Sequence, residues 1–197
     1  GLITTLDLAT VVKHLSGLAQ ELTLADGGIS VEPRDLRDLY NLFADLDVSM
    51  VDSLGALLAD VAPTRDVRVT GTAVDPAVGE RLNLAVSKYE GPTGIVGVLH
   101  DSLRKQGIPA ASLWANVPHY VTTDQNPPAT LALLRRLQSM LDLEFDFTDL
   151  EAAGTRFIAE VDAVVSSNPE ISSYVHRLEE AYDSGVDPDA DVDEGGY

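Results

Sequence analysis

The chain has 197 residues, 45% of them hydrophobic, and a formal net charge of −19. A chain of this size and composition buries one core, so we expect one domain with a small appendage and not two full domains. Cysteine is absent from the sequence, which excludes disulfides and thiolate chemistry. No apolar run approaches the roughly 20 residues that cross a bilayer, and the first residues are not those of a signal peptide, so we expect a soluble, cytoplasmic protein.

The negative charge is concentrated in the last quarter of the sequence. Residues 142–197 hold 16 acidic and two basic residues, whereas residues 1–141 hold 16 acidic and 11 basic ones. Nucleic acids and anionic membranes bind through Lys and Arg side chains that displace counterions, and an acidic field repels them. We therefore expect a protein partner, with no nucleic-acid and no membrane partner.

The first part of the chain combines helical and extended patterns. Residues 7–22 and 34–46 have leucines at helical spacing and predict two amphipathic helices. Residues 48–61 are apolar, and their pattern does not distinguish a strand from a helix. Residues 66–74 alternate between apolar and polar side chains, which predicts a strand.

An α/β pattern follows this strand. Asp75 before Pro76 is typical of a helix start. The stretch SKYEGPTGIVGVLHD turns into a second helix that Gly107 ends, and residues 108–117 predict a strand that stops at Pro118. The apolar face of the second helix is predicted to contain Ile95, Val98, Leu99 and Leu103. Strand, helix, helix and strand in this order favour an α/β fold with a mostly parallel sheet flanked by helices.

The remaining pattern is helical. Asn126 is expected to cap a helix that buries Leu131, Leu134, Leu137 and Leu141. Capping-box spacing at Thr148 and Glu151 predicts the next helix, and Asn168 with Pro169 predicts the last, whose apolar face includes Tyr182. These two helices should form an antiparallel hairpin. The predicted organisation is an α/β core at 1–143 with an atypical helical N-terminus at 1–35, a helical hairpin at 144–184 and a disordered acidic tail at 185–197.

Two places have residues suited to a small ligand. Thr93 and Gly94 lie where a helix begins, and the free N–H groups there attract anions, although a capped turn explains the same residues and is commoner. His119 follows the end of a strand, close to Asn116, and could act as a general base. A histidine that holds the loop by a hydrogen bond is the alternative. The candidate ligand-binding residues are therefore Thr93, Gly94, Asn116 and His119, and His119 is the candidate catalytic residue.

The sequence predicts no metal site and no cofactor. His100 and Asp101 are adjacent on a helix and point in different directions, and the other histidines lack metal-ligand partners at useful spacing. The acids between Asp187 and Glu194 lack the central glycine and terminal glutamate of a calcium loop. Trp114 is expected in the core or as the anchor of an interface.

Three segments together resemble a known family. They are LGALLADVAPTRDVRVTGTA, YEGPTGIVGVLHDSLRKQGIPAASLWANVPHYV and NPEISSYVHRLEEAYD, and the likeness extends from about Leu36 to Asp183. The chain resembles the bacterial branch of the proteasome assembly chaperone family. The resemblance implies an α/β fold with phosphorylase-like architecture, a C-terminal helical appendage, self-association and a role in protein assembly. Family members usually carry several more strands at the N-terminus, where about 35 residues of this chain have a helical pattern.

Two functions follow from these features. The first is a non-enzymatic, assembly-chaperone-like protein that binds other proteins and self-associates, which the resemblance implies and which agrees with the incomplete catalytic residue sets. The alternative is a nucleoside phosphorylase-like or hydrolase-like enzyme that acts on a small substrate at the strand ends. That alternative depends on fold analogy, which is a poor guide to activity.

Overall fold

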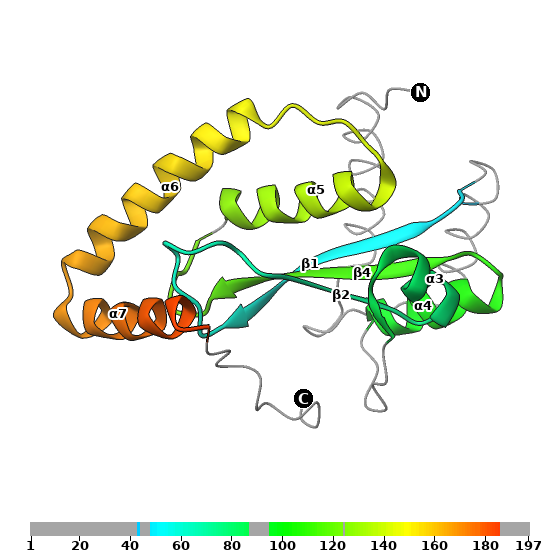
Figure 1. Cartoon of the computed structure of the whole chain (residues 1–197), viewed down its shortest axis with the longest axis horizontal. Coiled ribbons are helices and arrows are strands. Elements are labelled where there is room, and N and C mark those ends of the chain that lie inside the picture. Colours follow the sequence, from blue (N-terminus) through cyan, green and yellow to red (C-terminus); the bar gives the residue numbers. More distant parts are fainter. Residues whose placement is uncertain (1–42, 44–47, 87–94, 124, 186–197) are drawn as a thin grey trace, which may run out of the picture. The chain divides into compact units, whose positions relative to one another are not determined.

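The computed structural model describes residues 43, 48–86, 95–123 and 125–185, and this part of the chain has an α/β fold (Figure 1). It contains four strands and five helices, and no described helix is long and apolar enough to span a bilayer. In chain order the elements are β1 (Val51–Ala59), β2 (Val69–Ala73), α3 (Pro76–Leu82), β3 (Ala85–Val86), α4 (Ile95–Lys105), β4 (Ala110–Pro118), α5 (Pro127–Leu141), α6 (Thr148–Ser166) and α7 (Pro169–Asp183).

The strands form one sheet in the order β1-β4-β2-β3. The N–H of Val51 donates to the carbonyl of Pro109, and the N–H of His119 donates to the carbonyl of Ala59. These bonds at both ends of the pair show that β1 and β4 are parallel. The segment at 48–61, whose sequence pattern did not distinguish a strand from a helix, therefore contains a strand, β1.

The other two pairings complete a mixed sheet. The N–H of Asn116 donates to the carbonyl of Arg68, and the Thr70 hydroxyl donates to the carbonyl of Trp114, so β2 is antiparallel to β4. β2 and β3 are parallel, with Thr72 opposite Ala85. Two of the three pairings are parallel, which confirms the predicted mostly parallel α/β sheet flanked by helices.

The chain folds into two compact units, each assembled from several stretches of sequence. Unit 1 takes its described residues from 1–53, 72–111 and 143–145, and unit 2 takes them from 54–71, 112–142 and 146–197. The division predicted from the sequence, with boundaries at 143 and 184, remains a prediction.

In unit 1 the helix signals of the sequence are confirmed. The Asp75 carboxylate accepts a hydrogen bond of 2.8 Å from the N–H of Ala77 at the start of α3. Gly107 follows the end of α4 with a φ of 75°, a conformation that favours glycine. On the predicted apolar face of α4, Leu103 is fully buried and Val98 is 40% exposed. His100 is buried on this helix instead.

In unit 2, α5 packs on β2 and β4. The contact contains three buried side chains and three partly buried ones: Ala115, Val117 and Ala129, then Val67, Val69 and Leu133. The Asn126 side chain caps α5 as predicted by accepting from the N–H of Ala129. Leu137 is buried, but Leu141 is 36% exposed, because it is the last residue before the chain leaves the helix at Asp142 in a left-handed conformation.

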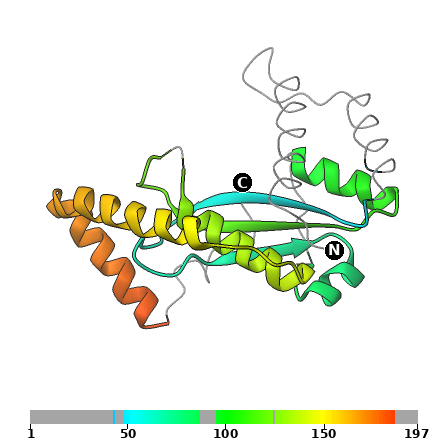
Figure 2. The same cartoon turned by 90° about the horizontal axis from the view of Figure 1, so that it is seen from above.

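The predicted helical hairpin is confirmed by α6 and α7, which lie against each other (Figures 1 and 2). Asn168 caps α7 by accepting from the N–H groups of Glu170 and Ile171. The hairpin core comprises Val165 and Val175 with Ala62, packed against Tyr120, Val161, Ile171 and Leu178.

Two details of the hairpin differ from the sequence prediction. The predicted capping box at Thr148 and Glu151 is wrong. The Asp146 carboxylate instead accepts a 3.0 Å hydrogen bond from the N–H of Thr148, at the first residue of α6. Tyr182, on the predicted apolar face of the last helix, is 42% exposed, because it lies in the last turn of α7. The helices expected at 7–22 and 34–46 and the tail beyond Gly185 lie outside the described residues, apart from Phe43, which is helical.

Candidate functional site

Asn116 lines a small cavity in unit 2. Its side chain is 5% exposed, and its Oδ1 atom has no hydrogen-bond partner among the described residues. The cavity has a volume of about 20 Å³, and its walls include Asn126 and Phe157. A volume of this size holds about one water molecule and no nucleoside. Asn116 is thus positioned to bind a water molecule between β4 and the start of α5.

His119 lies just beyond β4 and is paired with an acid. Its Nδ1 atom is 3.1 Å from Oδ1 of Asp60, the residue that follows β1. The Tyr174 hydroxyl on α7 donates a 2.7 Å bond to the same oxygen. A carboxylate next to Nδ1 fixes the orientation of the histidine ring. The same arrangement occurs in enzymes in which an acidic residue orients a histidine that acts as a base. His119 is not among the residues that line the cavity of Asn116, so the structure does not bring these two candidates into one pocket.

Three rings gather around this histidine. His119, Tyr120 and Tyr174 make edge-to-face contacts with centroid distances of 5.3 to 6.0 Å. The Tyr120 hydroxyl donates 2.8 Å to the carbonyl of Val61. Burial raises the pKa of Tyr120, and burial with the Asp60 hydrogen bond raises that of Tyr174 to about 12. Both phenols therefore stay protonated at neutral pH and act as hydrogen-bond donors.

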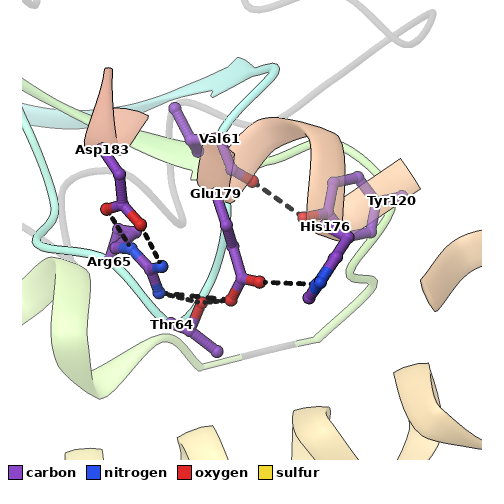
Figure 3. Close-up of polar contacts among 7 residues, drawn as sticks. All are labelled: Val61, Thr64, Arg65, Tyr120, His176, Glu179 and Asp183. Atoms are coloured by element: carbon purple, nitrogen blue, oxygen red, sulfur yellow. Dashed lines mark hydrogen bonds and ion pairs between the residues drawn. The ribbon is translucent and has the colours of Figure 1, made fainter. Parts of the chain in front are cut away.

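An arginine after β1 attaches α7 to the sheet (Figure 3). Arg65 donates from Nε and Nη2 to the two oxygens of Asp183, at 2.8 and 2.7 Å, and lies 3.2 Å from Glu179. Glu179 also accepts from the Thr64 hydroxyl and lies 3.2 Å from Nδ1 of His176. The two-pronged contact is the strong geometry for a guanidinium and a carboxylate. It lowers the pKa of Asp183 and places an acidic helix against the loop that follows β1.

An open hollow lies in unit 2. Its volume is about 680 Å³, and it lies between residues 64–69, α5 and α6. Its apolar lining consists of Val67, Val69, Pro128, Leu131, Ala132, Gly154 and Ile158. Three arginines also line it, Arg65, Arg135 and Arg136, together with Asp66 and Glu151. Arg135 is held 2.6 Å from Glu151 across the gap between α5 and α6.

Unit 1 contains a second histidine contact. The Ser53 hydroxyl lies 3.1 Å from Nε2 of His100, which is 3% exposed, and burial lowers the pKa of this histidine. Asp101, its neighbour, is instead paired with Arg104 and Lys105, so the two residues point apart as predicted. A hydroxyl and a neutral imidazole in this arrangement satisfy each other's hydrogen bonds.

Other predicted site residues can be placed only in part. Thr93 and Gly94 lie outside the described residues, and their role as ligand-binding residues remains a prediction, as do the roles of Asn116 and His119. Among the residues that the structure describes, no group of three or more His, Cys, Asp or Glu side chains could hold a metal ion.

Sequence reasoning missed the partners of His119 and Arg65. Asp60 and Tyr174, which both contact His119, are 114 residues apart in the sequence, and Arg65 and Asp183 are 118 residues apart. No local pattern relates such positions. The available signal was the sequence DVAPTRD after an apolar strand, because acids and arginines there lie at a strand end, where the helices of an α/β fold begin and finish.

Comparisons with known proteins agree with this fold. A family model described as PAC2 family matches residues 30–165. A solved PAC2 family protein from Streptomyces avermitilis is 41% identical with a TM-score of 0.65, over 74% of this chain and 62% of its own. A proteasome-assembly chaperone homologue from Mycobacterium tuberculosis is 41% identical with a TM-score of 0.61, over 71% and 59% of the two chains. No curated protein matches the chain significantly.

A third solved structure shows the same fold at lower identity. It is a protein of unknown function from Mycobacterium tuberculosis, 22% identical with a TM-score of 0.70, over 81% of this chain and 54% of its own. The chain spans about three fifths of the length of the two more similar structures. Because the family model covers well over half of the sequence, the chain belongs to the PAC2 family.

Proposed function

We propose that this protein is a non-enzymatic, assembly-chaperone-like protein of the cytoplasm that binds other protein subunits and self-associates. The observation that carries the proposal is its 41% identity to a proteasome-assembly chaperone homologue over 71% of the chain. The name of that homologue makes unassembled proteasome subunits the first partner to test.

The open hollow of unit 2 supports a protein partner. Its lining combines apolar side chains with Arg65, Arg135 and Arg136, in a chain whose net charge is −19. Apolar side chains together with arginine are typical of protein interfaces. The partner segment that fits has an apolar anchor flanked by carboxylates, because opposite potentials speed encounter and exclude surfaces of the wrong charge.

The enzyme alternative receives less support from the described residues. This alternative places the substrate at the strand ends, where the cavity beside Asn116 has about 20 Å³, whereas small-molecule sites usually enclose about 300 to 1,000 Å³. A thermal-shift screen with phosphate, nucleosides and nucleotides tests this alternative directly. A ligand that binds only the folded state raises the Tm, so a reproducible increase with any of them would favour the enzyme.

The partner experiment compares two arginines on neighbouring helices. The chain is mixed with unassembled proteasome subunits of its source organism, and complexes are weighed by native mass spectrometry. Arg136→Glu reverses a charge in the hollow, and Arg156→Glu makes the same change on an exposed position of α6 that does not line it. We expect the first variant to weaken the complex about tenfold or more and the second to leave it nearly unchanged.

Two results would contradict the proposal. A wild-type chain that forms no complex with any subunit removes the assembly role. Equal loss of binding in both variants shows that the overall charge, and not the hollow, controls the contact.

A further inference from the structure

Gly154 lies buried inside α6, although a glycine lowers the stability of a helix interior relative to alanine. Its backbone conformation does not require glycine, because Gly154 is not among the residues with a positive φ. A Cβ atom placed on it would have Pro128 of α5 as its nearest neighbour, at 3.9 Å, which is an ordinary van der Waals distance. Packing within the described part of the chain therefore does not require a glycine at this position either.

Gly154 is one of the residues that line the hollow of unit 2, and the others recur at helical spacing. On α5 the lining residues are Pro128, Leu131, Ala132, Arg135, Arg136 and Ser139. On α6 they are Glu151, Gly154, Thr155 and Ile158. Steps of three and one place each set on a single helix face, which on α5 extends for about 16 Å at a rise of 1.5 Å per residue. The hollow is therefore an elongated groove that matches the length of two to three helical turns.

We propose that an amphipathic helix of a partner protein, with an apolar face flanked by carboxylates, lies in this hollow with its backbone close to Gly154. The proposal rests on the proposed function, which assigns a protein partner to the hollow, and it names the structural class of the segment that binds. The distance between packed helices depends on the side chains at their contact. Gly154 on α6 and Ala132 on α5 are the small residues that let a third helix approach both.

The charges of the lining favour carboxylates on the bound helix. The lining contains three arginines and two acids, which leaves one net positive charge: Arg65, Arg135 and Arg136 against Asp66 and Glu151. Arg135 is held 2.6 Å from Glu151, and its guanidinium lies over the Phe147 ring at 5.9 Å, so this side chain loses less freedom on binding. The negative field of the rest of the chain is screened beyond about 8 Å at physiological salt, so the local charges decide the contact.

A helix fits this groove better than an extended segment does. The hollow has a partly apolar lining in which Val67, Leu131 and Ile158 contribute side chains. An extended segment would bring main-chain N–H and C=O groups against these side chains without partners, whereas a helix satisfies its main-chain groups internally. A helix from a second copy of this chain is an outcome of the test below.

The first experiment uses the opposite effects expected of Gly154→Ala. In the free chain we expect a higher urea midpoint than in the wild type, because alanine favours the helix and its Cβ has room. The probe for binding is a fluorescein-labelled peptide of about 18 residues, long enough to populate a helix, with leucines at every third or fourth position and glutamates on both sides. By fluorescence anisotropy we expect Gly154→Ala to bind it at least about fivefold more weakly than the wild type.

The second experiment compares two leucine substitutions on α6. Gly154→Leu fills the hollow and should abolish peptide binding. Ala163→Leu adds a leucine at an exposed position of α6 that does not line the hollow, and it should bind the peptide as the wild type does. Circular dichroism confirms that both variants remain folded.

Two further peptides test the chemistry of the occupant. An isomer with a central proline cannot form a continuous helix, and we expect it to bind the wild type at least about tenfold more weakly. A peptide with lysine in place of each glutamate should lose affinity to a similar extent. Equal binding of the proline isomer would overturn the helical class, and equal binding of the lysine peptide would overturn the charge preference.

The remaining outcomes separate this inference from the proposed function. A lower urea midpoint in Gly154→Ala would show that the fold needs the glycine and would remove the premise. If the wild type does not bind the acidic peptide, or Gly154→Leu binds it equally well, the inference is overturned, while the proposed function stands as long as native mass spectra show complexes with proteasome subunits. Peptide binding without any subunit complex supports the hollow and overturns the assembly role. A wild-type dimer that Gly154→Leu abolishes and the peptide displaces assigns the hollow to a second copy and overturns the partner.

Discussion

β1 and β4 are neighbouring strands of nine residues each, and they differ in burial in a way that their composition does not predict. β4 has eight buried residues, including Leu113 at 0% exposure. β1 has more leucines than β4, yet Leu58 is 68% exposed. The difference follows from position, since β4 lies between two strands and β1 has a described neighbour on one side only. Hydropathy shows which strands can be buried, and topology decides which ones are.

The two strands also show a close fit where they meet. A Cβ atom placed on Gly55 of β1 would lie 2.4 Å from the ring of Trp114 on β4, closer than atoms can approach. The absence of a side chain at Gly55 therefore leaves room for the Trp114 ring against β1. Trp114 was expected in the core or at an interface, and it is half-buried beside the exposed edge.

The largest effect is expected from a matched pair of leucines. Leu113→Ala should lower the free energy of unfolding by about 2–5 kcal/mol, because it removes a fully buried side chain and leaves a cavity. Leu58→Ala should change it by less than about 0.5 kcal/mol, since the side chain is mostly in water. Urea denaturation of both variants measures the difference. Equal losses of unfolding free energy in the two variants would mean that the Leu58 side chain is buried in solution.

The glycine at the strand contact should be sensitive to any side chain. Gly55→Val should destabilise the fold by about 1–3 kcal/mol, because Trp114 has to leave its position over the strand. The chain has a single tryptophan, so its fluorescence reports the displacement. Ala56→Val, on the next and exposed residue, is the control and should leave the emission unchanged.

Asp52 on β1 makes the edge strand sensitive to pH. Burial raises its pKa to about 6 from 3.8, and its Oδ1 has no partner among the described residues. The folded state therefore binds the proton more tightly than the unfolded state, and stability falls as pH rises from about 4 to about 6.

Asp52→Asn removes this titration. At pH 7.5 the variant should be more stable than the wild type, by on the order of 1 kcal/mol once solvent screening is taken into account. At pH 4 the two should converge. A constant difference between pH 4 and 7.5 in thermal unfolding would show that the carboxyl is not the cause.

The smallest effect is expected at the ion pairs of α7. Arg65→Gln loses the two-pronged contact with Asp183, and α7 should exchange its amide hydrogens faster while the core of β4 does not. Because exposed ion pairs are screened, the difference should shrink in about 1 M salt. Arg104→Gln, which loses a pair within α4, is the control and should leave α7 unchanged. Equal exchange of α7 in both variants would assign its attachment to the apolar contacts alone.

The sequence predicted the features that depend on neighbours along the chain. The caps at Asp75, Asn126 and Asn168, the end of α4 near Gly107 and the hairpin of α6 and α7 are all local signals, and each is confirmed. The fold class followed from the order of strands and helices.

Features that depend on distant partners were not predictable in this way. Periodicity placed Leu141 inward and Val98 and Tyr182 on apolar faces, and all three are partly exposed, because helical spacing gives the direction of a side chain and not what covers it. The pairing of His119 with Asp60 and of Arg65 with Asp183 arises only when β1, β4 and α7 are brought together. The exposure of β1 required the strand order of the sheet.

Native mass spectrometry of the chain mixed with unassembled proteasome subunits tests the central claim, that the protein binds other protein subunits, most directly. The account predicts a complex that Arg136→Glu in the hollow of unit 2 weakens about tenfold or more and that Arg156→Glu on α6 leaves nearly unchanged. A wild-type chain that forms no complex with any subunit would contradict it.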